Sequence, residues 1–182
     1  MNWKNSTERF GSVSIGLHWL MLLLLIGVYA CIDLTDLYPK HSAQREALKA
    51  WHFMLGLTVL LLAAVRLIAR TSGPRPAIVP AMPIWQTRLA GLLHIALYAL
   101  MIGAPLLGWL TLSAAGKPIP FFGQQLPPLL AANEALAHDL KEIHEALATI
   151  GYFLIAAHAL AALFHHYVMR DNTLVRMLPR QR

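Results

Sequence analysis

Cysteine is almost absent from this sequence of 182 residues, with Cys31 as its single example. One cysteine excludes an internal disulfide, an iron–sulfur cluster held by this chain alone, and covalent haem attachment through a CxxCH motif. We interpret Cys31 as a small apolar residue near a helix end. Charge is scarce as well, because 13% of the residues are charged, whereas 57% are hydrophobic.

The hydrophobic residues are gathered into four long runs. A run of this length predicts a transmembrane helix, because about 20 residues at 1.5 Å each cross the hydrocarbon core. No small-x-small cleavage pattern follows the first run, so we expect it to stay as a helix rather than be removed as a signal peptide. The sequence therefore predicts an all-α membrane protein, a single four-transmembrane-helix bundle over residues 1–182, with helices at about 15–32, 50–69, 89–115 and 141–169.

The segments between the runs carry unequal charge. The N-terminal tail, the link after the second run and the C-terminal tail hold ten of the fifteen basic residues, and the two opposite links hold the other five. Because lysine and arginine favour the cytoplasmic side, both termini are expected to be cytoplasmic. The last opposite link contains several prolines, and Asn133 after them predicts a cap for a helix that runs into the fourth span.

Nine histidines are unusual in so apolar a chain, and ionisable residues inside membrane spans are functional candidates. On the fourth span, His144 and His158 are 14 residues apart, which is about 21 Å along the axis and about 40° short of four full turns. Both therefore face the same side. His52 is expected at the depth of His144, and His18 at the depth of His158, which gives one histidine pair in each leaflet.

Two facing imidazoles in a bundle core are the ligand set of a low-spin haem b. Gly56 lies one turn from His52, and Gly151 lies midway between the two histidines of the fourth span, so neither would obstruct a flat ligand. His94 could replace His18 as the partner of His158. A proton relay is the alternative role for each histidine, and packing is the alternative role for the glycines.

Several charged or polar residues lie near these predicted pairs. Arg66 is 14 residues after His52 and therefore faces the same way, at the depth of His18 and His158. It could pair with a haem propionate, or its side chain could simply extend to the membrane surface. Lys49 and Lys141 each precede a pair member by three residues, so they could hold propionates or attract a small anion. His165, seven residues beyond His158, would suit a propionate, a quinone oxygen or a proton path.

Four segments of the chain resemble the bacterial cytochrome b561 family: SIGLHWL, WHFMLG, KEIHEALATIGYFLIAAHALAALFHHY and the closing DNTLVRMLPR. The likeness covers nearly the whole chain. It implies two non-covalent b haems, one between His18 and His158 and one between His52 and His144, and it leaves His94 without iron. It also implies electron exchange with ubiquinone in the cytoplasmic (inner) membrane of a Gram-negative bacterium.

One member of that family oxidises superoxide at the outer face and reduces ubiquinone, and we take this as the expected reaction. Lys141, with Lys49 and Lys117, would then guide the anion, and His165 or Arg66 would lie near the quinone. Seven carboxylates in the outer links weaken a strongly positive funnel. The alternatives are a haem-b subunit that relays electrons between a partner dehydrogenase or hydrogenase and quinone, and a histidine-lined proton channel or transporter.

Overall fold

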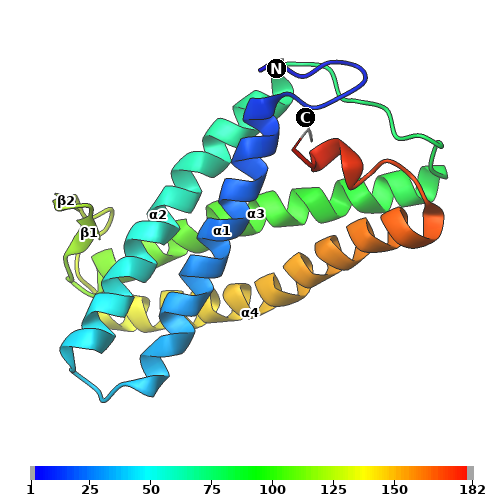
Figure 1. The fold of residues 1–182 in the computed structure, drawn as a ribbon. Coiled ribbons are helices and arrows are strands. Elements are labelled where there is room, and N and C mark those ends of the chain that lie inside the picture. The colour runs from blue at the N-terminus through cyan, green and yellow to red at the C-terminus, as the bar shows by residue number, and fades with distance from the viewer. Residues whose placement is uncertain (1–2, 180–182) are drawn as a thin grey trace.

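The computed structural model describes residues 3–179, so Arg180 and Arg182, which contribute to the expected charge asymmetry, lie outside the described residues. Most of the described chain is helical (Figure 1). In chain order the elements are α1 Ser12–Asp33, the 3₁₀ turn η1 Leu34–Leu37, α2 Ala43–Thr71, α3 Ile84–Ala114, the strands β1 Ile119–Phe121 and β2 Gln124–Leu126, α4 Glu134–Phe164, the π-helical turn η2 His165–Met169 and the 3₁₀ turn η3 Val175–Met177.

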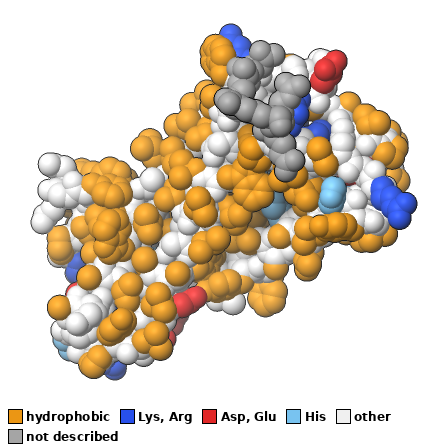
Figure 2. Space-filling model, viewed as in Figure 1, with side chains coloured by type: hydrophobic (Ala, Val, Ile, Leu, Met, Phe, Trp, Pro, Cys, Tyr) orange, Lys and Arg blue, Asp and Glu red, His pale blue; other side chains and the backbone are white. Residues whose placement is uncertain are grey.

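The four long helices are long and apolar enough to cross a membrane, which confirms the predicted fold class. Large apolar side chains point outward along them, among them Leu23, Leu92 and Phe153, which are 65%, 64% and 73% exposed. Hydrophobic side chains accordingly spread over the visible face (Figure 2). Such surface is stable only against lipid or a partner.

The helices extend beyond the apolar runs. Polar residues 43–49 continue α2 outward, and the Ser42 hydroxyl caps it by accepting from the Arg45 amide at 3.3 Å. Residues 134–145 extend α4 in the same way, and the Asn133 side chain accepts from the Leu136 amide at 3.1 Å, so the predicted cap is confirmed. Hydropathy detects only the part of a helix that crosses hydrocarbon, which explains the shorter expected ranges.

The helices form two antiparallel hairpins that cross each other, α1 with α2 and α3 with α4 (Figure 1). Between them lies a buried cluster of Met21, Val59, Ala63 and Met101. The antiparallel hairpin of β1 and β2, which the sequence did not predict, packs Ile119 onto α2 and α3.

Both ends of the described chain lie at one end of the molecule, here called the terminal end, with the link 72–83. The opposite end, here called the loop end, carries links 34–42 and 115–133. After α4 the chain turns back toward α1, where the Trp19 indole donates to the Met177 carbonyl at 2.7 Å. The Asn172 side chain accepts from the Val79 amide at 3.0 Å. This C-terminal segment therefore joins α4 to both α1 and the link 72–83.

Candidate functional site

The first histidine pair lies toward the loop end, between α2 and α4. The ring centres of His52 and His144 are 6.1 Å apart, with the ring planes at 84°. Each ring is held by a neighbouring helix: His52 Nδ1 donates to the Val28 carbonyl, and His144 Nδ1 donates to the Ala104 carbonyl, both at 2.9 Å. A carbonyl only accepts, so the proton is on Nδ1 and the lone pair of each Nε2 is free to bind a metal.

The second pair lies toward the terminal end, between α1 and α4. The ring centres of His18 and His158 are also 6.1 Å apart, with the planes at 74°. His94 on α3 is close to the same partner, at 5.2 Å and 77° from His158. Its Nδ1 donates to the Ala90 carbonyl one turn back at 2.6 Å. His158 therefore lies close to both His18 and His94, the two partners that the sequence left open.

The separation within each pair suits a metal with two axial imidazoles. An imidazole nitrogen lies about 2 Å from a bound metal and its ring centre roughly 1 Å further, so two axial rings have centres about 6 Å apart. A structural zinc site would want three or four ligands at one depth. Residues 3–179 contain no group of three or more His, Cys, Asp or Glu side chains arranged for a metal. The donor sets therefore fit porphyrin iron, whose ring supplies the other four nitrogens.

The two glycines near the histidines have different surroundings. A side-chain carbon on Gly56 would meet nothing within 4 Å. One on Gly151 would meet the hydroxyl of Tyr29, and then Leu100 at 3.0 Å. That hydroxyl donates to the Ala148 carbonyl at 2.9 Å, one turn before Gly151. Gly151 therefore provides room for Tyr29, and its contact with a cofactor stays a prediction.

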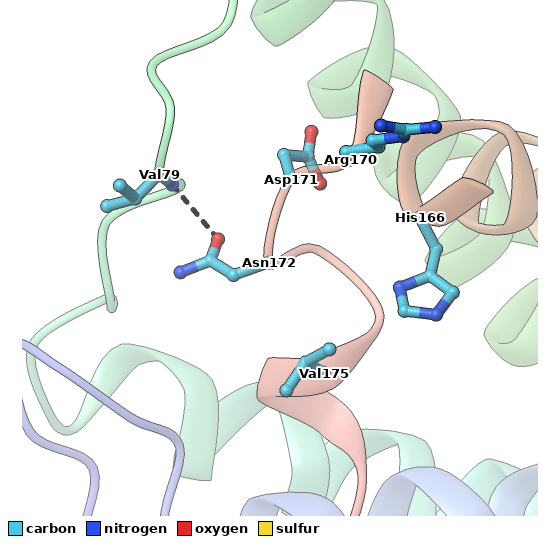
Figure 3. A pocket seen from close by; sticks show the side chains of 6 residues that line it. All are labelled: Val79, His166, Arg170, Asp171, Asn172 and Val175. Carbon is cyan, nitrogen blue, oxygen red and sulfur yellow. Dashed lines mark hydrogen bonds between the residues drawn. The ribbon is translucent and has the colours of Figure 1, made fainter. Parts of the chain in front are cut away.

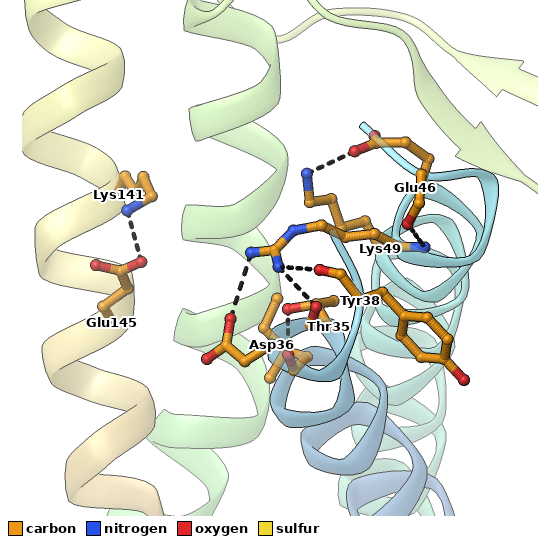
Figure 4. A network of polar contacts seen from close by, with 10 residues as sticks. Thr35, Asp36, Tyr38, Glu46, Lys49, Lys141 and Glu145 are labelled. Atoms are coloured by element: carbon orange, nitrogen blue, oxygen red, sulfur yellow. Dashed lines mark hydrogen bonds and ion pairs between the residues drawn. The ribbon is translucent and has the colours of Figure 1, made fainter. Parts of the chain in front are cut away.

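Two lysines at the loop end, Lys49 and Lys141, are paired with carboxylates (Figure 4). Lys49 Nζ lies 2.7 Å from Glu46, and Lys141 Nζ lies 2.6 Å from Glu145. The spacings are i,i+3 and i,i+4 on single helices, which sequence reasoning could have detected. Lys49 is the less exposed of the two, at 35% against 61% for its side chain. The free positive charge at this end is therefore smaller than the lysines alone suggest.

A comparison with known proteins identifies the family. The model of the prokaryotic cytochrome b561 family matches residues 9–180. The chain belongs to the prokaryotic cytochrome b561 family. It is 42% identical to cytochrome b561 homolog 1 of Escherichia coli K12 over 175 residues, which cover 96% of this chain and 99% of the relative. The probable superoxide oxidase CybB of Yersinia pestis is 38% identical over 175 residues, with 96% and 98% covered. Cytochrome b561 homolog 2 of E. coli K12 is 31% identical over 180 residues, with 98% and 95% covered.

Membership confirms the resemblance drawn from the sequence and implies that the chain binds haem b. With its four membrane-crossing helices, this cytochrome b561 is a multi-pass bacterial membrane protein. The number of haems, their ligands and the side on which the termini lie stay predictions.

At the terminal end of this cytochrome b561, His165 has a partner that the sequence did not reveal. Its Nδ1 donates to Asp171 Oδ2 at 2.6 Å, and both side chains are largely buried, at 14% and 3% exposed. Asp171 also lines a pocket of about 360 Å³ (Figure 3), together with Val79, His166, Arg170, Asn172 and Val175. The six-residue separation has no helical periodicity, so no pattern in the sequence predicts this contact.

Proposed function

We propose that this cytochrome b561 holds two b haems, one between His52 and His144 and one between His18 and His158, and transfers electrons from superoxide to ubiquinone. The observation that carries the proposal is the repeat of one geometry: two facing imidazole pairs, each with ring centres 6.1 Å apart, at the two ends of one helix face. When bound, haem b supplies a one-electron couple at each site.

The side chains around each pair set how the imidazoles are presented. Val28 and Ala104 fix the rings of His52 and His144 through Nδ1, which leaves Nε2 as the ligating atom. At the other pair, Arg66 Nη2 lies 2.7 Å from His18 Nδ1. Ligation through Nε2 needs a proton on Nδ1, so Arg66 has to find another acceptor, and a haem propionate would serve.

The loop end is the proposed entry for superoxide. Lys49 and Lys141 are the basic residues nearest to His52 and His144 along their helices, and Lys117 lies at the same end. Their charge would draw the anion toward the pair, although Glu46 and Glu145 offset part of it. The Yersinia pestis relative that is named a probable superoxide oxidase supports superoxide as the donor.

The terminal end is the proposed place of ubiquinone reduction. Ubiquinone takes two electrons and two protons, so its site needs a proton donor as well as a nearby electron donor. His165 begins η2, directly after α4, and is seven residues beyond His158, about 10 Å along the axis. It is the proposed proton donor, and two superoxide anions, each released as dioxygen, would supply the two electrons.

A superoxide pulse tests the proposal. Purified protein with ubiquinone in detergent is mixed with superoxide, and reduction of the b-type band and formation of quinol are followed together. We expect both to be faster than spontaneous dismutation allows and to disappear when superoxide dismutase is added. A protein without a b-type band would contradict the cytochrome, and a band that superoxide cannot reduce would contradict the donor.

A second candidate function is the relay of electrons from a partner dehydrogenase to quinone. Apolar side chains exposed at the loop end favour it, among them Leu37 at 73% and Phe122 at 53%. Such a patch could seat a partner protein. The same experiment separates the two, because a relay subunit without its partner would bind haem yet respond to superoxide no faster than an unrelated b-type cytochrome.

A further inference from the structure

The turn that ends α4 folds Asp171 back onto His165. Residues His165–Met169 widen into a π-helical turn, and Arg170 follows in the left-handed conformation at φ +56°. The Asp171 amide then donates to the His165 carbonyl at 3.1 Å, while its carboxylate accepts from His165 Nδ1 at 2.6 Å. A non-glycine residue with positive φ costs energy and is found where the surrounding structure requires it. The strained turn thus holds one carboxylate against one imidazole.

The pair is largely buried at the terminal end, beside an open pocket. Asp171 is 6% exposed as a residue and lines the pocket of Figure 3, and His165 is seven residues beyond His158 along the chain. The Thr173 amide donates to the other carboxylate oxygen at 2.8 Å. With both oxygens bonded, the carboxylate is fixed in place and His165 Nε2 is left as the atom that can exchange a proton.

We propose that His165 and Asp171 are the proton-donating pair for reduction of the quinone, with His165 as the donor and Asp171 as its positioning residue. This inference rests on the proposed function. For each proton, the N–H bond at Nε2 of the imidazolium breaks and an O–H bond of the quinol forms. Nδ1–H stays bonded to Asp171 throughout, and water of the terminal end returns a proton to Nε2. Two such transfers accompany the two electrons from superoxide, so the charges balance.

The charges around the pair favour this role. The carboxylate of Asp171 stabilises the imidazolium at contact distance. Arg170 lines the same pocket as Asp171, and Arg176 on η3 is close enough to interact with Asp171 electrostatically. The carboxylate of Asp171 is the negative charge that offsets these two guanidinium groups next to the imidazole of His165.

Asp171→Asn tests the inference because it preserves the shape of the side chain and removes its charge. We expect quinol formation to fall about tenfold at pH 7.5, and the pH at which the rate is half-maximal to move down by about one unit. Asp171→Glu should keep the position of the wild-type pH profile. The b-type spectrum and the reduction of the protein by superoxide without quinone should be unchanged in both variants.

Asn172→Ala is the matched control, since it removes bonds to the link 72–83 from the adjacent residue without changing any charge. Its pH profile should match that of the wild type. If Asn172→Ala moved the profile as much as Asp171→Asn, or if Asp171→Asn left it unmoved, the pair would not be the proton donor. A wild-type protein that is reduced by superoxide but forms no quinol would instead contradict the proposed acceptor.

Discussion

Nη2 of Arg66 lies 2.7 Å from Nδ1 of His18, and a guanidinium can only donate, so Nδ1 is an acceptor there. At His52, His94 and His144 the same atom donates to a backbone carbonyl. His18 is therefore the one of these four whose hydrogen bond must change before Nε2 can bind iron. Arg66 is therefore expected to influence the proposed haem at the terminal end.

Replacing Arg66 should affect one haem and spare the other. In Arg66→Met, a cation that stabilises the reduced state is lost. The midpoint potential of the proposed haem between His18 and His158 should therefore fall by some tens of millivolts, where about 59 mV is a tenfold change. Redox titration of the b-type bands measures this. Arg70→Met, which removes a guanidinium stacked 5.5 Å from the Tyr98 ring centre one turn away, should change neither potential appreciably. Equal shifts of both haems in Arg66→Met would contradict the assignment.

Gly151→Ala should destabilise the protein by about 1–3 kcal/mol, because the added methyl group meets the Tyr29 hydroxyl and Leu100 in a packed interface. Thermal unfolding followed by helical circular dichroism measures the loss. Gly56→Ala is the control, because a side-chain carbon there meets no protein atom within 4 Å, and it should change the midpoint temperature less than Gly151→Ala does. Adding Tyr29→Phe to Gly151→Ala should recover part of the loss. If the double variant were no more stable than Gly151→Ala, the added methyl group would clash with Leu100 alone.

Glu145→Gln should speed the reaction with superoxide, about two- to threefold at low salt, because Lys141 would lose its 2.6 Å counter-ion. The gain should shrink as salt is added. Glu142→Gln changes the net charge equally but lies beside His138 rather than bonded to a lysine, so it should give a smaller gain. Equal gains in the two variants would mean that only the overall charge of the loop end matters.

The Asp171 carboxyl should make the C-terminal segment sensitive to acid. Burial alone raises its pKa, but the hydrogen bonds from Thr173 and His165 outweigh burial and hold the pKa below the ordinary value of about 3.9. A group with a lowered pKa in the folded state contributes stability that is complete above its unfolded pKa and is lost as pH falls through the folded one. Wild type should therefore be more stable than Asp171→Asn at pH 6, and the difference should shrink as the pH falls below about 3.9. A constant difference across this range, measured by thermal unfolding, would show that the charge is not responsible.

The sequence predicts the helices and the two histidine levels well because both depend on local periodicity. The 14-residue spacing of His144 and His158 puts both on one face of any straight helix, and hydropathy alone locates the four spans. The lysine–glutamate pairs have spacings of i,i+3 and i,i+4, so the same periodicity could also have predicted them.

Other features depend on tertiary packing and leave no periodic signal. The contact of Tyr29 with Gly151 joins α1 to α4, and the contact of Asp171 with His165 depends on a π-helical turn and a left-handed Arg170. The hairpin of β1 and β2 follows prolines and turns through Phe122 and Gly123, both at positive φ, which the proline count alone did not predict.

The number and position of the haems test the central claim most directly. Haem content and the reduced-minus-oxidised spectrum should be measured for the wild type and for alanine variants of His18, His52, His94, His144 and His158. We predict two haems per chain in the wild type, one in each variant of His18, His52, His144 and His158, and two in His94→Ala. Loss of a haem in His94→Ala with both retained in His18→Ala would contradict the pairing at the terminal end, and one haem in the wild type would contradict the two-site account altogether.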